Sequence, residues 1–184
     1  MKIGRDIIRP TAVLIIIAVV ISGLVAVVYN FTKLPETVGM SDKALEASQE
    51  MLGTDQLQTL LNDDFSDAVT GAVVTEDGEY AVAATGKGYG GDIEVVVAFN
   101  TDDSIKAVRI VSASETPGIG TRVTETDDLT KQFEGMTGQA TIGDNIDGVT
   151  GATASSKGVA EAVNQAVDNL DKAKNGTVYT GEGE

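Results

Sequence analysis

Apolar residues are distributed along the chain in two contrasting ways. Residues 11–29 form one continuous run without a charged side chain. That run is close to the roughly 20 residues that a helix needs to cross the hydrocarbon core of a membrane. Beyond it, short apolar segments alternate with polar and glycine-rich ones, as in a water-exposed domain. We therefore predict one membrane-spanning helix followed by one folded domain.

The first half of the domain contains a helical pattern and then four strand-like segments. Ser41 can cap a helix that carries apolar residues at helical spacing and stops at Gly53, and a second short helical turn is expected at 55–61. Runs rich in Val and Ala, separated by turn-forming residues, predict an antiparallel meander with strands near 68–75, 79–85, 92–99 and 104–111.

The second half is predicted to be mainly helical. Residues 122–134 are expected to form a helix and residues 138–142 to return as a strand. Residues 154–172 carry one apolar stripe and one acidic face, which is typical of a helix packed on a sheet. Strands followed by helices favour an α+β fold, with one antiparallel sheet and packed helices in a domain at 41–174.

Charges near the apolar run predict its orientation. Lys2, Arg5 and Arg9 precede it, so the positive-inside rule places residues 1–10 in the cytoplasm and the domain outside, extracellular or periplasmic. Residues 30–40 would form a tether, and 175–184 a flexible tail. A cleaved signal peptide is the alternative, but the run is longer than a usual signal-peptide core and no clear cleavage site follows it.

Composition excludes several kinds of chemistry. The formal net charge is −15, and after residue 30 the chain has 10 basic and 27 acidic residues, a balance of −17. Such a surface repels nucleic acids. The chain contains no Cys, which excludes iron–sulfur ligation by thiolates and disulfides, and no His, which removes the commonest metal ligand and the usual catalytic base. No acidic residues are spaced like a calcium loop, and we predict no metal site.

The segment DGVTGAT at 147–153 is the strongest candidate for chemistry. Small residues, Gly148, Gly151 and Ala152, lead to the hydroxyl of Thr153 just before the last helix. The simplest interpretation is a helix cap, in which Thr153 or Ser155 accepts hydrogen bonds from first-turn amides. A phosphate on Thr153 would instead face those amides and the positive end of the helix dipole.

DGVTGAT resembles the flavin-attachment motif of the FMN-binding domain family. GKGYGGDIEVVVAFN at 86–100 and SETPGIG at 114–120 resemble further motifs of that family in the same order. The family includes the G subunit of Rnf ion-translocating complexes and the C subunit of sodium-translocating NADH:quinone reductase. The resemblance implies that Thr153 carries FMN as a phosphoester. It also implies a separate FAD-dependent flavin transferase, since a threonine hydroxyl is a poor nucleophile.

The resemblance assigns roles to other residues of the two loops. Asp147, Gly148, Thr150, Gly151 and Ala152 would form the strip that the transferase recognises, with Thr150 the nearest competing hydroxyl. The second loop would line the flavin pocket through Glu115, Thr116, Pro117, Gly118 and Gly120. Within that loop, glycines let backbone amides approach a planar ring.

The expected function is that of a redox subunit, not of an enzyme acting alone. The resemblance implies a membrane-anchored FMN carrier in an Rnf-type complex, which moves electrons between ferredoxin and NAD while pumping sodium ions or protons, among other membrane subunits. One alternative is an extracellular flavin shuttle outside any pump. Another is a non-redox anchored binding module in which DGVTGAT is only a helix cap.

Overall fold

The computed structural model describes residues 14, 15, 17, 18, 21–23, 39–118 and 120–180. The chain divides into two units, Met1–Thr37 and Val38–Glu184, and the fold below is that of the second unit. The predicted membrane span at 11–29 lies mostly outside the described residues, and the few described ones are helical. No helix within the described ranges is long and apolar enough to cross a bilayer.

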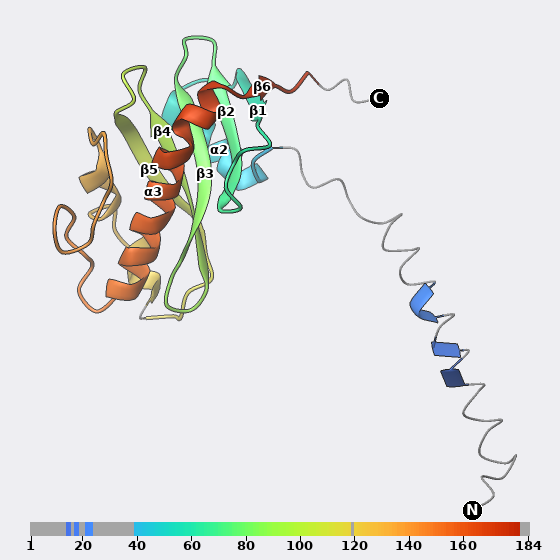
Figure 1. Ribbon diagram of the computed structural model, residues 1–184. Helices are drawn as coiled ribbons and strands as arrows, with labels where there is room; N and C mark the ends of the chain where they lie inside the picture. The colour runs from blue at the N-terminus through green and yellow to red at the C-terminus, as the bar shows by residue number, and fades with distance from the viewer. Residues whose placement is uncertain (1–13, 16, 19–20, 24–38, 119, 181–184) are drawn as a thin grey trace, which may run out of the picture. The chain divides into compact units, whose positions relative to one another are not determined.

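A six-stranded antiparallel sheet forms the centre of the domain (Figure 1). Its strands lie in the order β5-β4-β3-β2-β1-β6, so neighbouring strands are mostly consecutive in sequence. This confirms the predicted α+β class and the predicted meander. The strand bounds are β1 Leu57–Leu61, β2 Val69–Thr75, β3 Tyr80–Lys87, β4 Asp92–Phe99, β5 Ile105–Ala113 and β6 Thr177–Val178.

The two main helices cover opposite faces of this sheet. Helix α3, Thr153–Lys174, lies across one face, and α2, Asp42–Leu52, lies on the other (Figure 1). In β3, Val82 packs in the same cluster as α3, while Ala81 and Ala83 pack with α2. Because both faces are covered, the central strands are almost continuously apolar instead of alternating with polar residues.

Both helices form where their sequence patterns predict them. Ser41 caps α2 by accepting a hydrogen bond from the Ala44 amide at 3.2 Å, and Gly53 ends the helix with a left-handed φ of 73°. Helix α3 buries the predicted stripe, with Val159, Val163 and Ala166 at 0% exposure, and keeps Glu161 exposed.

Three predicted elements are wrong. Residues 55–61 do not form a helical turn, because Leu57–Leu61 is strand β1 and pairs with β2 and β6. Residues 122–134 form two short 3-10 helices, η1 Gly120–Thr124 and η2 Thr130–Phe133, instead of one α-helix. Residues 138–142 form no strand and contribute only an isolated bridge between Ile142 and Ile146.

The sheet also extends into the segment expected to be a flexible tail. Strand β6, Thr177–Val178, pairs antiparallel with β1 through Leu60 and Leu61. The amide of Tyr179 donates to the carbonyl of Thr59 at 2.8 Å, which continues the pairing by one residue. The C-terminal end of α3 is therefore joined to the sheet through the strand that follows it.

Helix α3 approaches β3 unusually closely at two glycines. A Cβ added to Gly158 would lie 2.6 Å from the Lys87 carbonyl oxygen, and one added to Gly86 would lie 2.1 Å from the Gly158 carbonyl oxygen. These separations leave no room for a side chain on either residue. The contact lies little more than one helical turn beyond Thr153, so it also positions the N-terminus of α3.

Candidate functional site

The segment 147–153 leads directly into α3, whose first helical residue is Thr153. The N-cap is Ala152, and no side chain caps the helix. The expectation that Thr153 or Ser155 acts as the cap is therefore wrong. Among the described residues, the first-turn amides of Thr153, Ala154 and Ser155 find no acceptor. Unpaired amides at the N-terminus of a long helix favour a negatively charged group.

Four hydroxyl groups lie in or next to this segment, and only two face solvent. Thr150 and Thr153 are exposed. Ser155 and Ser156 are both 0% exposed. The Ser156 hydroxyl is also engaged, because it accepts from the Val149 amide at 2.9 Å and donates to the Ala152 carbonyl at 3.0 Å. A modifying enzyme can therefore reach Thr150 and Thr153 but neither serine.

Two further side chains hold the segment in place from outside. The Gln132 amide group donates to the Asp147 carbonyl at 3.1 Å and accepts from the Asp147 amide at 2.8 Å. The Arg122 guanidinium donates from Nη1 to the Thr150 carbonyl at 3.1 Å. Both residues come from the 120–133 region, so that region fixes the shape of the loop that displays Thr153.

The backbone conformation at Gly151 favours glycine. Its φ is +80°, a conformation that residues with side chains rarely adopt. A Cβ at this position would also lie only 2.8 Å from Arg122 Nη1. The small residue thus allows the guanidinium to lie directly against the loop.

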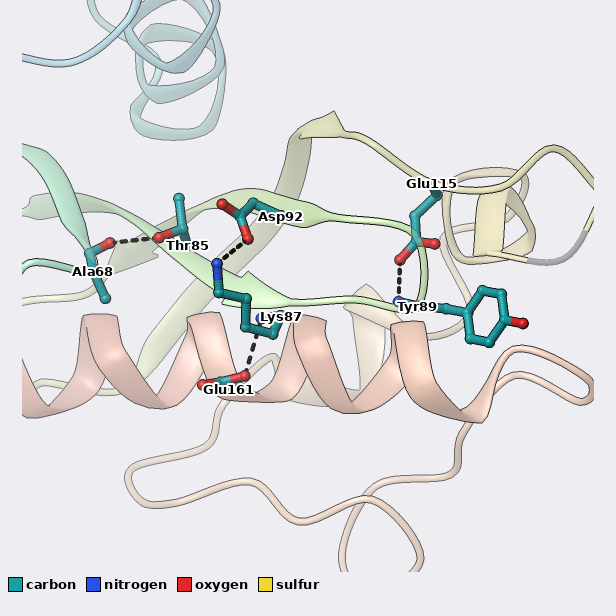
Figure 2. Close-up of polar contacts among 7 residues, drawn as sticks. All are labelled: Ala68, Thr85, Lys87, Tyr89, Asp92, Glu115 and Glu161. Carbon is teal, nitrogen blue, oxygen red and sulfur yellow. Dashed lines mark hydrogen bonds and ion pairs between the residues drawn. The ribbon is translucent and has the colours of Figure 1, made fainter. Parts of the chain in front are cut away.

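Glu115 connects the loop after β5 to the turn between β3 and β4. Its carboxylate accepts hydrogen bonds from the amides of Tyr89 and Gly90, both at 2.9 Å, and Figure 2 shows the first of them. Cβ atoms placed on Gly88 and Gly120 would lie 1.8 and 1.9 Å from its two oxygens. These two glycines therefore leave the space that the carboxylate occupies.

Hydrogen bonding keeps Glu115 ionised. Burial alone raises the pKa of its carboxyl, but bonds from the Gly90, Tyr89 and Thr116 amides favour the charged form, and the pKa is lowered overall. The Ser155 hydroxyl acts in the same direction. Its Oγ does not meet hydrogen-bond geometry with any described atom, so it acts on the carboxylate as a nearby dipole.

The β3–β4 turn is joined to both loop and helix. The turn bonds to Glu115 through the Tyr89 and Gly90 amides. It also bonds to α3, because the Lys87 amide donates to the Glu161 carboxylate at 3.0 Å (Figure 2). At the tip of the turn, the Tyr89 side chain is 63% exposed and its ring points away from Glu115 (Figure 2). An exposed aromatic ring beside the Glu115 loop is available to a ligand or a partner.

The two groups of predicted site residues meet at one end of the domain. Glu115 lies near Ser155 in the first turn of α3, and Arg122, two residues after Gly120, contacts the carbonyl of Thr150. The first of the two loops contains Glu115 and Thr116. The next two residues of that loop, Pro117 and Gly118, are exposed, and Gly120 is buried. In the other group Asp147, Gly148, Thr150, Gly151 and Thr153 are exposed, and Ala152 is buried.

Sequence analysis missed the residues that hold this arrangement together. Arg122, Gln132 and Ser156 bond to the segment 147–153 and were not predicted. Ser155 was predicted only as a possible cap, and its buried hydroxyl has no hydrogen-bond partner among the described residues. The sequence did contain one signal for Arg122, because it is an isolated cation two residues after the SETPGIG motif in a strongly acidic chain.

Comparisons with known proteins agree with the motifs. Residues 88–168 match the FMN-binding domain family. The G subunit of the proton-translocating ferredoxin:NAD(+) oxidoreductase complex of Clostridium ljungdahlii is 38% identical over 109 residues, which are 55% of each chain. The chain thus aligns with about half the length of that relative. The G subunit of the ion-translocating oxidoreductase complex of Methanosarcina acetivorans is 27% identical over 91% of this chain and 96% of its own.

One solved structure is also similar. It is the C subunit of the Na(+)-translocating NADH-quinone reductase from Parabacteroides distasonis, at 19% identity and a TM-score of 0.48, covering 68% of this chain and 82% of that one. The family match includes the Glu115 loop and the segment that ends at Thr153. The match over residues 88–168 agrees with the family resemblance predicted from the three motifs, so this part of the chain is similar to FMN-binding domains.

Proposed function

We propose that the chain carries FMN covalently, as a phosphoester of Thr153, and serves as a redox subunit of an ion-translocating oxidoreductase complex. The observation that carries the proposal is the exposed Thr153 hydroxyl at the start of α3, next to three amides that have no acceptor among the described residues. When bound, FMN would accept and pass on electrons, while the protein attaches and orients it.

The residues around Thr153 fit a phosphate. Free amides and the positive end of the helix dipole stabilise negative charge within the first turn of a helix. The buried Ser155 hydroxyl has no hydrogen-bond partner in the described part of the chain, although it lies near the Glu115 carboxylate. Gly148, Gly151 and Ala152 keep side chains away from the approach to the hydroxyl.

Attachment would require a second protein. Thr Oγ is a weak nucleophile, and the sequence contains no His or Cys to activate it. We therefore propose that an FAD-dependent flavin transferase recognises Asp147, Gly148, Thr150, Gly151 and Ala152 and modifies Thr153. The loop that contains Glu115, Thr116, Pro117, Gly118 and Gly120 would then flank the ring.

The complex is proposed from the names of the relatives, which are G subunits of ion-translocating oxidoreductases, including ferredoxin:NAD(+) complexes of the Rnf type. In this proposal residues 11–29 anchor the chain in the cell membrane, with the N-terminus in the cytoplasm and the FMN domain on the outer side. Covalent attachment suits that location, because a flavin released outside the cell could not readily be recovered.

The test is to coexpress the full chain with a flavin transferase and to compare two matched variants. Thr153→Val and Thr150→Val each remove one exposed hydroxyl and keep the branched shape of the side chain. We expect Thr153→Val to lose all covalent flavin in a denaturing gel, while Thr150→Val still carries flavin, in a reduced amount because Thr150 belongs to the proposed recognition strip. Loss of flavin in Thr150→Val but not in Thr153→Val would place the attachment site at Thr150. A wild-type protein without covalent flavin would refute the proposal.

A further inference from the structure

Arg122 has more hydrogen-bonding capacity than the structure uses. Its Nη1 donates to the Thr150 carbonyl at 3.1 Å, and its side chain is exposed. A guanidinium has five N–H donors in a planar fork, and no other hydrogen bond from Arg122 is found among the described residues. Several donors of a permanent cation are therefore free within reach of the attachment loop.

Four other cations of the domain are paired with carboxylates, one of them Lys87 with Asp92, whereas Lys43, Lys131, Lys157 and Lys172 have no ion pair among the described residues. Arg109 pairs with Glu50, Lys174 with Asp103, and Lys106 with Glu79 at 2.8 Å. Arg122 has no carboxylate within ion-pair distance in the part of the chain that the structure describes. In a domain with a large excess of acids, an arginine that bonds to a backbone carbonyl instead of a carboxylate keeps its charge for another partner.

The start of α3 also carries backbone donors without an acceptor. The amides of Thr153, Ala154 and Ser155 have no acceptor among the described residues, and the Ser155 hydroxyl is buried without a hydrogen-bond partner. Arg122 Nη1 lies 2.8 Å from the Cβ position of Gly151, two residues before Thr153. A cation, three free amides and one unpaired hydroxyl thus lie around the same short segment.

We propose that Arg122 is the cationic ligand of the phosphate that links FMN to Thr153. This inference rests on the proposed function, because it assigns a partner to the phosphoester proposed there. The phosphoester keeps one negative charge, which suits a charge-assisted hydrogen bond from a guanidinium. Through its bond to Thr150, the same side chain holds the loop in shape before the flavin is attached.

The experiment measures the phosphorus NMR signal of the flavin-loaded full chain, folded and unfolded in urea, after coexpression with the transferase. Arg122→Gln removes the charge, and Arg122→Lys keeps the charge without the fork. Arg109→Gln is the matched control, because it removes an exposed arginine charge from β5. Gln132→Leu is the second control, because it removes the two bonds to Asp147 without changing any charge.

We expect Arg122→Gln to move the folded phosphorus signal more than halfway towards its unfolded position and to lower the fluorescence anisotropy of the flavin. Arg122→Lys should fall in between, and both controls should stay near wild type. If a variant loads incompletely, the signal of its loaded fraction is compared.

An unchanged signal in Arg122→Gln would overturn the inference and leave the proposed function standing. Equal shifts in Arg122→Gln and Gln132→Leu would also overturn it, because Arg122 would then act only by shaping the loop. A wild-type chain without covalent flavin would overturn the proposed function itself, and this inference with it.

Discussion

The close contact between Gly158 and β3 predicts whether the Gly158→Ala variant is more or less stable than wild type. In Gly158→Ala, the new Cβ would lie 2.6 Å from the Lys87 carbonyl oxygen and 2.8 Å from the Gly88 amide nitrogen. Both neighbours are backbone atoms, which cannot move aside as a flexible side chain can. The first turns of α3 would have to shift away from the sheet.

Two opposing effects set the magnitude. Replacing glycine by alanine inside a helix stabilises it by about 1 kcal/mol. Overpacking at a tight contact costs about 1 to 3 kcal/mol. If the contact is as close as the structure has it, Gly158→Ala should be destabilised by up to about 2 kcal/mol; if α3 stood further from β3, the same variant would be stabilised by about 1 kcal/mol.

Urea unfolding of the full chain in detergent, followed by far-UV circular dichroism, measures this difference. Gly138→Ala is the matched control, because nothing lies within 4 Å of its Cβ position and its φ is not in the left-handed region. The control should be neutral or slightly stabilised. A Gly158→Ala chain that is more stable than wild type would refute the close contact and the positioning of Thr153 that depends on it.

Three further predictions concern single side chains. Glu115→Gln should lower stability at neutral pH, and because the pKa of Glu115 is lowered from 4.5 in the folded state, its advantage over the variant should disappear as pH falls through that lowered pKa; a constant difference down to strong acid in urea titrations would contradict this. Ser41→Ala should cost about 1 kcal/mol in the same assay, since it removes the acceptor of the Ala44 amide, and an unchanged urea midpoint would argue against the cap. Phe133→Ala should cost about 3 to 5 kcal/mol because the ring is fully buried, and a loss below about 1 kcal/mol would mean that the ring is not in the core.

Local sequence signals predicted the elements whose stability is set locally. Ser41 and Gly53 mark the ends of α2, and the spacing of Val159, Val163 and Ala166 marks the buried face of α3. Strand β1 could not be found in this way. Its leucines at 57, 60 and 61 have helical spacing, and the segment is a strand only because it pairs with β2 and β6.

The site was predictable where residue type alone carries the information. The attachment segment and the Glu115 loop stand out by their glycines and by family resemblance, but their mutual arrangement depends on contacts that no spacing encodes. Gln132 bonds to both backbone groups of Asp147, and Arg122 bonds to Thr150, across 15 and 28 residues of sequence. Ser155 and Ser156 are neighbours in sequence, yet only Ser156 is engaged in hydrogen bonds among the described residues.

The central claim is that Thr153 carries FMN, and the most direct test is the intact mass of the denatured full chain purified from its native membrane. Peptide mapping of residues 141–157 would then locate the added group. The account predicts an increment of one FMN, less one water, on the peptide that contains Thr153, with the fragment ions placing it on that residue. A chain whose whole population has the unmodified mass would contradict the account, and so would an increment located on Thr150.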